Sequence, residues 1–510
     1  MKKTLALFAL AFSLLSCGPG VIECVNPLTY TDIPDNDVIR VGDDFYMIST
    51  TMYFCPGAPI MHSRDLVHWQ IVSYVYDCLN DDDVYNLRDG RNAYGCGQWA
   101  ASLRYHDGMF YALFIAKDQN RTFIYKTKDI TSSYWEQTVI DEPFHDASLL
   151  FDDDGRVYVV WGNGELYIAE LEPDLSGLKE GGVRQLLIDS PKEGMMLRAE
   201  GSHIYHIGDY YYILEIDWPF RGVRTETCWR SKELLGEYES RTILQGTLDE
   251  KKSGVAQGAI IETRKGDWYA MMFMDHGAVG RIPTLQPVTW VDGWPILGND
   301  TVPVDSFEVN LKPCGENYTW ASDEFDSEEL ALVWQWNHKP VDSCWSLTER
   351  PGWMRISTEG LATGIKDARN TLTQRTVGPG CISEVKMDAS GLNPGDHAGL
   401  CAFQSRYCCI EAQVDENGEK FLVALDFEKE IFRQPLDCDE VYLSLVYDFN
   451  TDEATMSFSL DGGTWCIIDY TLNMRFTLDF FTGYRSALYC YSTLEAGGHA
   501  DFDWFHQKAL

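Results

Sequence analysis

Positive charge is scarce in this chain of 510 residues, in which 41 Lys and Arg are set against 78 Asp and Glu. The formal net charge is therefore −37 at pH 7. A nucleic-acid-binding surface needs clustered basic residues to neutralise phosphates, so this balance argues against a nucleic-acid partner. It also disfavours anionic lipids and acidic glycans, and a neutral ligand is the expectation.

Long apolar runs are missing except near the N-terminus. There a basic pair at 2–3 precedes an apolar stretch at 4–16, which is typical of a signal peptide and too short to span a bilayer as a mature helix. The sequence LLSC at 14–17 resembles a bacterial lipobox. It predicts lipidation of Cys17 and an exported lipoprotein of a Gram-negative-type bacterium, facing the periplasm and touching the membrane only through its anchor. The alternative is an ordinary signal peptide with an incidental cysteine.

Metal-binding motifs are missing as well. Fourteen of the 15 cysteines follow Cys17, but none shows the CxxC or Cys/His spacing of a metal site. We therefore assign no metal ligands and expect no required cofactor. Buried thiols and a disulfide framework both remain open for these cysteines.

A Gly/Asp turn followed by an aromatic-rich strand occurs five times in the first 300 residues. The copies are RVGDDFYMI (40–48), YHDGMFYALF (105–114), FDDDGRVYVVW (151–161), HIGDYYYILE (206–215) and RKGDWYAMMF (264–273). Each predicts a β-hairpin. Their tyrosines, Tyr46, Tyr111, Tyr158, Tyr212 and Tyr269, are 65, 47, 54 and 57 residues apart, a period that indicates a propeller or array. Five four-stranded blades fit the length.

Five residues occupy equivalent positions, 11 or 12 residues before those tyrosines: Asp35, Trp99, Asp146, Glu200 and Gln257. Equivalent positions in a propeller face the same way, so these side chains should ring one mouth of the channel. Two carboxylates in one apolar-walled pocket cannot both keep ordinary pKa values, and glycosidic-bond cleavage needs such an acid and base. Any single acid at a loop start could instead be a cap or a turn residue.

The pattern changes after about residue 303. Short alternating strands with Asn-Gly and Asp-Gly turns then predict a β-sandwich. The expected organisation is a signal peptide at 1–17, a five-bladed β-propeller at 18–302, a linker at 303–319 and a C-terminal β-sandwich at 320–510. The fold class is therefore all-β.

The motifs resemble those of glycoside hydrolase family 43, in its branch of exo-acting β-xylosidases and α-L-arabinofuranosidases. The resemblance covers nearly the whole mature chain and is carried by NPLTYTDIPDNDVIRVGDDFYMISTTMYFCPGAPIMHSRDLVHW (26–69), GQWAASLRYHDGMFYALF (97–114), FHDASLLFDDDG (144–155), RAEGSHIYHIGDYYY (198–212) and DHGAVGRIPTLQPVTWVDGWPIL (275–297). It implies a five-bladed propeller, a concanavalin-like jelly-roll sandwich and inversion of anomeric configuration. A neutral plant-derived oligosaccharide is the implied substrate.

The resemblance also implies roles for individual residues. Asp35 in IPDNDVI matches the general base, Asp146 in HDAS the aspartate that tunes and orients the acid, and Glu200 in AEGSH the general acid. Arg281 in VGRIP matches a substrate-contacting arginine, and Trp99 in QWA matches an aromatic pocket wall. A structural role for Arg281 and core packing for Trp99 remain open.

Further pocket residues are predicted with less support from the sequence. Met52 and Phe54 would suit a pocket wall, although aromatic runs are more often core. The sandwich segment DFFTGYRS (479–486) matches a loop that reaches the propeller pocket, which makes Phe481, Tyr484 and Arg485 candidates for its lining, with sandwich core as the alternative.

Two positions depart from the family pattern. Asn36-Asp37 replaces the commoner Pro-Ser after the base. Gln257 stands where many members carry a channel histidine tied to a calcium ion or water, so a structural calcium is possible but unsupported. The catalytic trio is intact, and the sequence predicts an exo-acting hydrolase that releases terminal arabinofuranose or xylose. The alternatives are a non-catalytic glycan-binding lipoprotein and a propeller used for partner binding.

Overall fold

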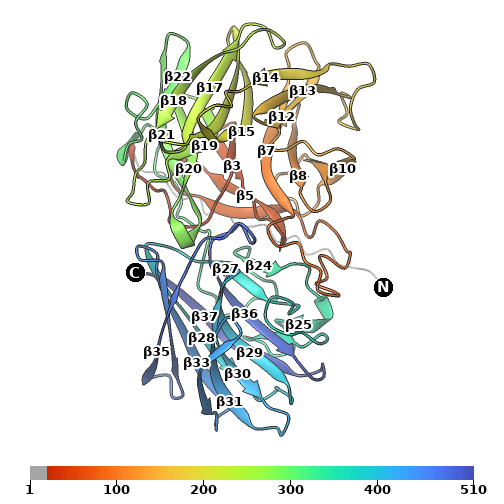
Figure 1. Cartoon of the computed structure of the whole chain (residues 1–510), viewed down its shortest axis with the longest axis vertical. Helices are drawn as coiled ribbons and strands as arrows, with labels where there is room; N and C mark the ends of the chain where they lie inside the picture. Colours follow the sequence, from red (N-terminus) through yellow and green to blue (C-terminus); the bar gives the residue numbers. More distant parts are fainter. Residues whose placement is uncertain (1–19) are drawn as a thin grey trace.

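The computed structural model describes residues 20–510 (Figure 1). The predicted lipidation site, Cys17, lies outside the described residues. The chain is all-β, with 3-10 turns only at η1 (Gly277–Val279) and η2 (Asp342–Cys344) in the described part. Figure 1 shows two stacked bodies, with the N-terminal propeller above and the C-terminal sandwich below. From residue 20 onward, no helix has the length and apolar character needed to cross a bilayer.

Five four-stranded antiparallel sheets form the blades of the propeller. Blade I contains β2 (Asp37–Val41), β3 (Asp44–Ile48), β5 (Gly57–Ser63) and β6 (Gln70–Tyr76). Blade II contains β7 (Gln98–His106), β8 (Met109–Ala116), β9 (Arg121–Thr127) and β10 (Glu136–Ile140). Blade III contains β11 (Ser148–Phe151), β12 (Val157–Asn163), β13 (Glu165–Leu171) and β14 (Arg184–Asp189). Blade IV contains β15 (Met195–Ile207), β16 (Tyr210–Pro219), β17 (Thr225–Ser231) and β18 (Glu239–Gln245), and blade V contains β19 (Val255–Glu262), β20 (Trp268–Asp275), β21 (Arg281–Val291) and β22 (Trp294–Leu297).

The five repeated turns join the first and second strands of the five blades, as the sequence predicts. The glycine of each turn has a φ between 60° and 83°, a conformation that glycine adopts without steric cost. In blade IV, for example, Tyr205 pairs with Tyr212 across the turn at Gly208. The first strands, β2, β7, β11, β15 and β19, contact one another in sequence around the axis, so their N-terminal ends meet at one mouth of the channel.

The N-terminal segment closes the ring by bonding to β21 of the last blade. Leu28 N–H donates to Pro283 O at 3.0 Å, and Ile33 N–H donates to Arg281 O at 2.8 Å. The side-chain amide of Asn26 donates to Leu285 O and accepts from Leu285 N–H. This closure brings Asp35, which lies just before β2, next to Arg281 at the start of β21.

The C-terminal body is a sandwich of two antiparallel sheets around an apolar core. One sheet has the order β32 (Lys429–Pro435), β31 (Lys420–Asp426), β30 (Cys408–Val414), β29 (Asp396–Phe403), β36 (Arg485–Ser492), β27 (Leu372–Arg375), β24 (Trp334–Asn337) and β4 (Phe54–Cys55). The other has the order β25 (Trp345–Ser346), β26 (Met354–Ser357), β37 (His499–Ala509), β28 (Gly380–Asp388), β33 (Glu440–Asp448), β34 (Glu453–Ser459) and β35 (Trp465–Asn473). Buried side chains of both sheets, such as Leu400, Leu443 and Phe502, fill the space between them.

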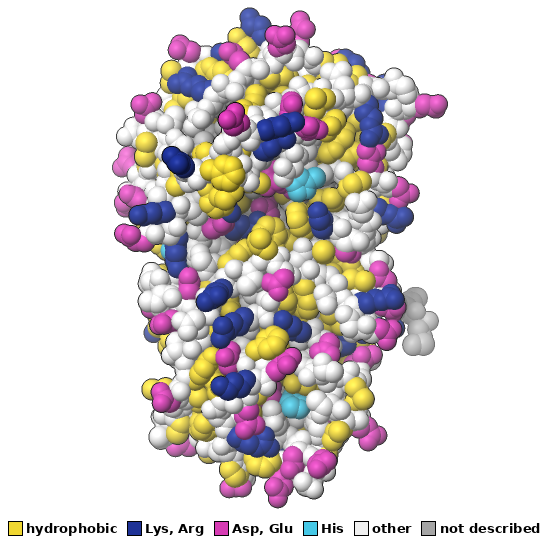
Figure 2. All heavy atoms as spheres, viewed as in Figure 1, with side chains coloured by type: hydrophobic (Ala, Val, Ile, Leu, Met, Phe, Trp, Pro, Cys, Tyr) yellow, Lys and Arg dark blue, Asp and Glu magenta, His cyan; other side chains and the backbone are white. Residues whose placement is uncertain are grey.

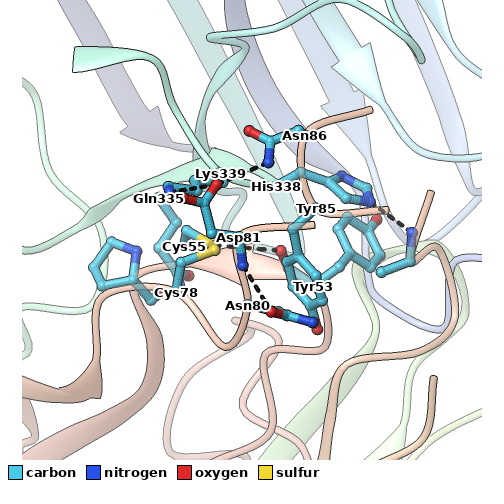
Figure 3. The surroundings of a disulfide bond; sticks show 12 residues. Tyr53, Cys55, Cys78, Asn80, Asp81, Tyr85, Asn86, Gln335, His338 and Lys339 are labelled. Carbon is cyan, nitrogen blue, oxygen red and sulfur yellow. Dashed lines mark hydrogen bonds and ion pairs between the residues drawn. A yellow bond between two sulfur atoms is a disulfide. The ribbon is translucent and has the colours of Figure 1, made fainter. Parts of the chain in front are cut away.

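The two bodies share a sheet, which the sequence did not predict. The expected propeller range, 18–302, includes β4, yet β4 pairs with β24 of the sandwich, with Cys55 opposite Trp336. The side chain of Gln335 donates to Pro56 O at 2.6 Å and reinforces this pairing. Cys55 also forms a disulfide with Cys78, as Figure 3 shows, so β4 is tied to the chain that leaves blade I.

The segment between the two bodies runs along the propeller. Its strand β23 (Ser306–Val309) pairs with β1 (Ile22–Val25), close to the start of the described chain. Further along, the side chain of Asn317 accepts a hydrogen bond from Trp69 N–H. Tyr318 then pairs with Gln70, the first residue of β6. The linker therefore packs on blade I before the sandwich begins.

Candidate active site

Backbone irregularities turn the predicted ring residues toward the channel. Asp35, Asp146 and Gln257 have φ values of 50°, 47° and 62°, a region that non-glycine residues seldom adopt. The pairing register of the first strand also shifts next to Trp99, Glu200 and Gln257. Such bulges re-aim side chains at the end of a strand. Three carboxylates, an indole and an amide are thus presented at equivalent positions of the five blades.

Asp35 lies in a buried ion pair with Arg281. The Nη1 atom of Arg281 is 2.7 Å from Oδ1 of Asp35, and both residues are at most 7% exposed. Burial raises the pKa of Asp35, while the guanidinium of Arg281 acts to lower it. Two other carboxylates, Asp32 and Glu200, act to raise this pKa further. Asp35 is therefore a carboxylate held in place by one partner within an otherwise poorly solvated pocket.

Glu200 lies in a different environment, next to His145 and Asn163. The Nε2 atom of His145 is 3.2 Å from Oε2 of Glu200 and 3.8 Å from Oδ2 of Asp146. The amide of Asn163, the last residue of β12, donates to the same Oε2 at 2.5 Å. The sequence analysis did not name His145 or Asn163. His145 could have been found because it precedes Asp146 within the quoted HDAS motif, whereas Asn163 carries no such signal.

The pKa values of Asp146 and His145, which lie next to Glu200, are both raised. Burial raises the pKa of Asp146 to about 7, although the adjacent His145 opposes the shift. Burial would lower the pKa of His145, but Asp146 and Glu200 together raise it to about 9. His145 and Asp146 therefore hold protons under conditions in which exposed carboxylates would have lost theirs. They can exchange a proton with a bound ligand.

A loop of the sandwich completes the site. Phe481 lies with its ring 5.6 Å from that of Trp99 and 4.6 Å from Cζ of Arg281. Trp99 also lies 5.8 Å from the ring of His145. Trp99 and Arg281 are therefore at the site, as predicted, and so is Phe481. The aromatic rings of Trp99 and Phe481 provide flat apolar surfaces of the kind on which sugar rings pack.

The loop that carries Phe481 is fastened to the propeller. Gly483 N–H donates to Oδ2 of Asp32 at 2.9 Å, and Tyr484 N–H donates to Ala278 O at 2.9 Å. A Cβ atom at Gly483 would lie only 2.0 Å from Val279 O, so glycine permits this close approach. The other oxygen of Asp32 accepts from Arg281 N–H, which links the loop directly to the Arg281 strand.

Four other candidates from the sequence are buried in contacts within the sandwich or between the two bodies. Tyr484 is buried and donates through its hydroxyl to Arg406 O within the sandwich. The guanidinium of Arg485 lies 3.7 Å from the ring of Phe54 and bonds to Gln335 in the seam between the two bodies. Met52 and Phe54 are each 1% exposed and offer no surface to a ligand here. Their burial in the interdomain core explains the aromatic run better than a pocket wall does.

The channel below the carboxylates is filled by an ionic network. Asp37 is fully buried, with Oδ2 2.7 Å from Nη1 of Arg104 and Oδ1 3.3 Å from Nδ1 of His203.

Gln257 packs against Gly201 and offers only one neutral oxygen. Calcium binds six to eight oxygens, so these residues do not fit a calcium ion at Gln257. Among the described residues, the three groups that could hold a metal ion together are His145, Asp146 and Glu200, whose ligand atoms lie within 4.8 Å of one another.

A buried carboxyl behind Gln257 makes stability depend on pH. Burial raises the pKa of Glu226 to about 8, against the opposing hydrogen bond from Gln257 N–H. In the unfolded chain a glutamate has a pKa of about 4.3, so below this pH Glu226 is protonated in both the folded and the unfolded state. Above this pH Glu226 keeps its proton only in the folded state. The free energy of unfolding therefore falls by up to about 1.4 kcal/mol per pH unit, until the pH passes the pKa of Glu226 in the folded state.

Replacement of Glu226 by Gln should therefore reduce the loss of stability with rising pH. We expect the drop in Tm between about pH 5 and about pH 7.5 to be smaller in Glu226→Gln than in the unsubstituted protein. Thermal denaturation followed by circular dichroism at the two pH values measures it. Parallel Tm changes in the two proteins would contradict the assignment of a protonated Glu226.

The fold and the site together define a class of enzyme. A five-bladed propeller with acids of unlike environment at one mouth, covered by a sandwich loop, is the scaffold of a glycoside hydrolase. The chain belongs to the glycosyl hydrolases family 43, whose model matches residues 24–295. A second model, the beta xylosidase C-terminal concanavalin A-like domain, matches residues 322–508.

Relatives with the same organisation extend over most of the chain. A beta-xylosidase of Formosa agariphila is 30% identical over 94% of this chain and 89% of its own length. A non-reducing end alpha-L-arabinofuranosidase of Bacteroides ovatus is 27% identical over 95% of this chain and 94% of its own. The solved structure of a bifunctional GH43-CE protein of Bacteroides eggerthii is 42% identical, with a TM-score of 0.91. It aligns with 96% of this chain, but this chain spans only 64% of it.

Proposed function

We propose that this glycoside hydrolase is exo-acting and inverting, and that it removes terminal α-L-arabinofuranosyl or β-D-xylosyl residues from neutral hemicellulose-type oligosaccharides. The observation that supports this best is the unlike setting of two carboxylates at one channel mouth. Asp35 is paired with a permanent cation, Arg281, whereas Glu200 receives hydrogen bonds from His145 and Asn163. An acid and a base are the pair that glycoside inversion requires.

In this mechanism Asp35 is the general base. Its charge is maintained by Arg281, and it takes a proton from a water molecule that attacks the anomeric carbon. Glu200 is the general acid and donates a proton to the leaving oxygen. Both hydrogen-bond donors from the described side chains bind Oε2 of Glu200, so Oε1 is the atom assigned to proton delivery. Asp146 lies next to His145 and influences the proton distribution around the acid.

The position of Phe481 supports exo action. This residue comes from the sandwich and covers the channel mouth between Trp99 and Arg281. A wall at that place would hold the terminal sugar and leave no continuous cleft through which a polymer could pass. Trp99 would stack on the sugar, and Arg281 would donate to sugar hydroxyls in addition to pairing with Asp35.

The cellular setting belongs to the same proposal. Lipidation at Cys17 would tether the enzyme to a membrane through a lipid anchor and place it among oligosaccharides in the periplasm. A non-catalytic glycan-binding lipoprotein on the same scaffold is the second candidate. The three carboxylates at equivalent blade positions favour the enzyme, because binding of a neutral sugar needs no such set.

A panel of 4-nitrophenyl glycosides tests the proposal. We expect release of nitrophenol from the α-L-arabinofuranoside, the β-D-xyloside or both, and none from hexosides. Proton NMR of the first product formed should show an anomer opposite to that of the substrate. Binding of sugar without release would establish the second candidate instead, and a product of retained configuration would exclude the inverting mechanism.

A further inference from the structure

A second cavity lies between the propeller and the sandwich, outside the catalytic channel. We name it the domain groove. Its volume is ≈ 640 Å³, and its main lining residues are Arg91, Tyr94, Lys366, Phe427, Asp479 and Phe480. The first two come from the long loop between β6 and β7, and the others come from sandwich loops. The volume is within the range of small-molecule sites.

The propeller side of the groove is firmly held. Its loop is fixed at one end by the Cys55–Cys78 disulfide and by the ion pair of Asp81 with Lys339, at 2.7 Å (Figure 3). Closer to the groove, Ala93 N–H donates to Nε2 of the buried His338 at 2.8 Å. The hydroxyl of Tyr94 donates to Lys366 O across the boundary between the two bodies. The groove is thus formed before any ligand arrives, which reduces the entropy cost of binding.

An exposed aromatic side chain stands at the sandwich side. Phe427 is 37% exposed at the tip of the hairpin between β31 and β32, and its φ is 58°. A bulky residue rarely adopts this conformation, and such residues gather at functional sites. Its ring lies 5.2 Å from that of Tyr407, which supports it from below. The hairpin therefore presents an aromatic face to the groove at a cost in backbone energy.

A cation lies over this aromatic surface. The ammonium of Lys366 is 4.8 Å from the ring centre of Phe427 and 5.3 Å from that of Phe480. The carboxylates of Asp479 and Glu428 act on its charge, but no acidic side chain between residues 20 and 510 lies within ion-pair distance of it, so its hydrogen-bond donors can serve a ligand. Arg91 also lines the groove, and its Nη1 lies 3.5 Å from Oδ2 of Asp83 in an exposed pair within the same loop. The positive and negative side chains of the lining are interspersed, which suits a neutral ligand rich in hydroxyls.

The groove and the catalytic pocket share a wall. Phe480 lines the groove and stacks on Tyr94 with a ring distance of 3.9 Å, while the next residue, Phe481, contacts Trp99 and Arg281 at the channel mouth. The loop at 478–481 therefore has the groove on one side and the active site on the other. A glycan held in the groove would lie directly beside the site that trims it.

We propose that the domain groove binds a neutral pentose-rich glycan chain as a second carbohydrate site of this enzyme. Phe427 stacks on a sugar ring, and Lys366 and Arg91 donate to hydroxyl groups. This inference rests on the proposed function, because it takes the ligand from the same class as the substrate. It goes further in giving the enzyme a means of retaining a polymer while the terminal residues are removed.

Affinity electrophoresis in gels containing neutral arabinoxylan tests the groove. All proteins carry Glu200→Gln so that the glycan is not consumed, and each is also made with Trp99→Ala, which removes the stacking surface of the catalytic pocket. We expect the parent protein to be retarded and Phe427→Ala to bind at least tenfold more weakly, which corresponds to a loss of about 1.4 kcal/mol. The matched control is Phe220→Ala, which removes a 68% exposed phenylalanine from blade IV and should leave the retardation unchanged.

Three results would overturn the proposal. Phe427→Ala could migrate as the parent does, with an unchanged Tm to show that it is folded. Trp99→Ala could abolish the retardation, which would place the binding in the catalytic pocket. The retardation could also occur only with glucuronoxylan, which would make the ligand acidic rather than neutral. Failure of the proposed function is separate, because it would appear as absent nitrophenol release from the unsubstituted enzyme.

Discussion

An Asp35→Asn variant should lose about 10²- to 10⁴-fold in kcat, the range by which a positioned general base accelerates a reaction. The amide keeps the size of the carboxylate but cannot take a proton from the attacking water. The loss should be similar for substrates with good and poor leaving groups, because each needs the same activated water. Initial rates on 4-nitrophenyl and 2,4-dinitrophenyl pentosides measure it.

The control for this variant separates charge from folding. Asp35→Asn also leaves the buried guanidinium of Arg281 without its partner, so its Tm should fall. Asp43→Asn removes an exposed aspartate that pairs with Arg264 on the propeller surface and should change neither rate nor Tm. If Asp35→Asn kept most of its activity, the assignment of Asp35 as the base would be wrong.

The propeller and its ring of site residues could be predicted from the sequence because the signal is local and repeated. Each blade begins with a hairpin whose glycine turn and aromatic strand are contiguous in the chain. Counting back from Tyr212 to Glu200, and from Tyr158 to Asp146, needs only equal blade geometry. Figure 2 shows acidic and basic side chains interspersed over both bodies on the face in view.

The contacts between the two bodies could not be predicted in this way. β4 is two residues long and pairs with β24, which lies about 280 residues later, and so short a pairing leaves no periodic pattern. Met52 and Phe54 were misplaced for this reason, because an aromatic run looks the same in a pocket wall and in an interdomain core. Asn163 was missed because a polar residue at a strand end is usually part of a turn.

The site itself depends on both bodies. Asp32 joins the Phe481 loop to the Arg281 strand, and Arg281 in turn holds Asp35. The base is thus oriented through a chain of bonds that begins in the sandwich. This gives a physical reason for the large, shared interface, and it makes the C-terminal body a part of the active site.

A Glu200→Gln variant should lose activity in proportion to the basicity of the leaving group. Gln cannot donate a proton as a carboxylic acid does, so a sugar alkoxide that must leave from an oligosaccharide is strongly affected. We expect a loss of about 10²- to 10⁴-fold on such substrates. A 2,4-dinitrophenolate needs little protonation, and its departure should be slowed far less. A plot of log kcat/KM against the pKa of the leaving group should therefore be steeper for the variant.

The slope of that plot distinguishes an acid from a merely structural residue. If Glu200 only positioned the substrate through Asn163 and His145, Glu200→Gln would lower all rates by the same factor and leave the slope unchanged. Glu193→Gln, an exposed glutamate just before β15, should match the unsubstituted enzyme throughout. Because Asp35→Asn is expected to lower all rates alike, the two variants together separate the step that activates water from the step that protonates the leaving group.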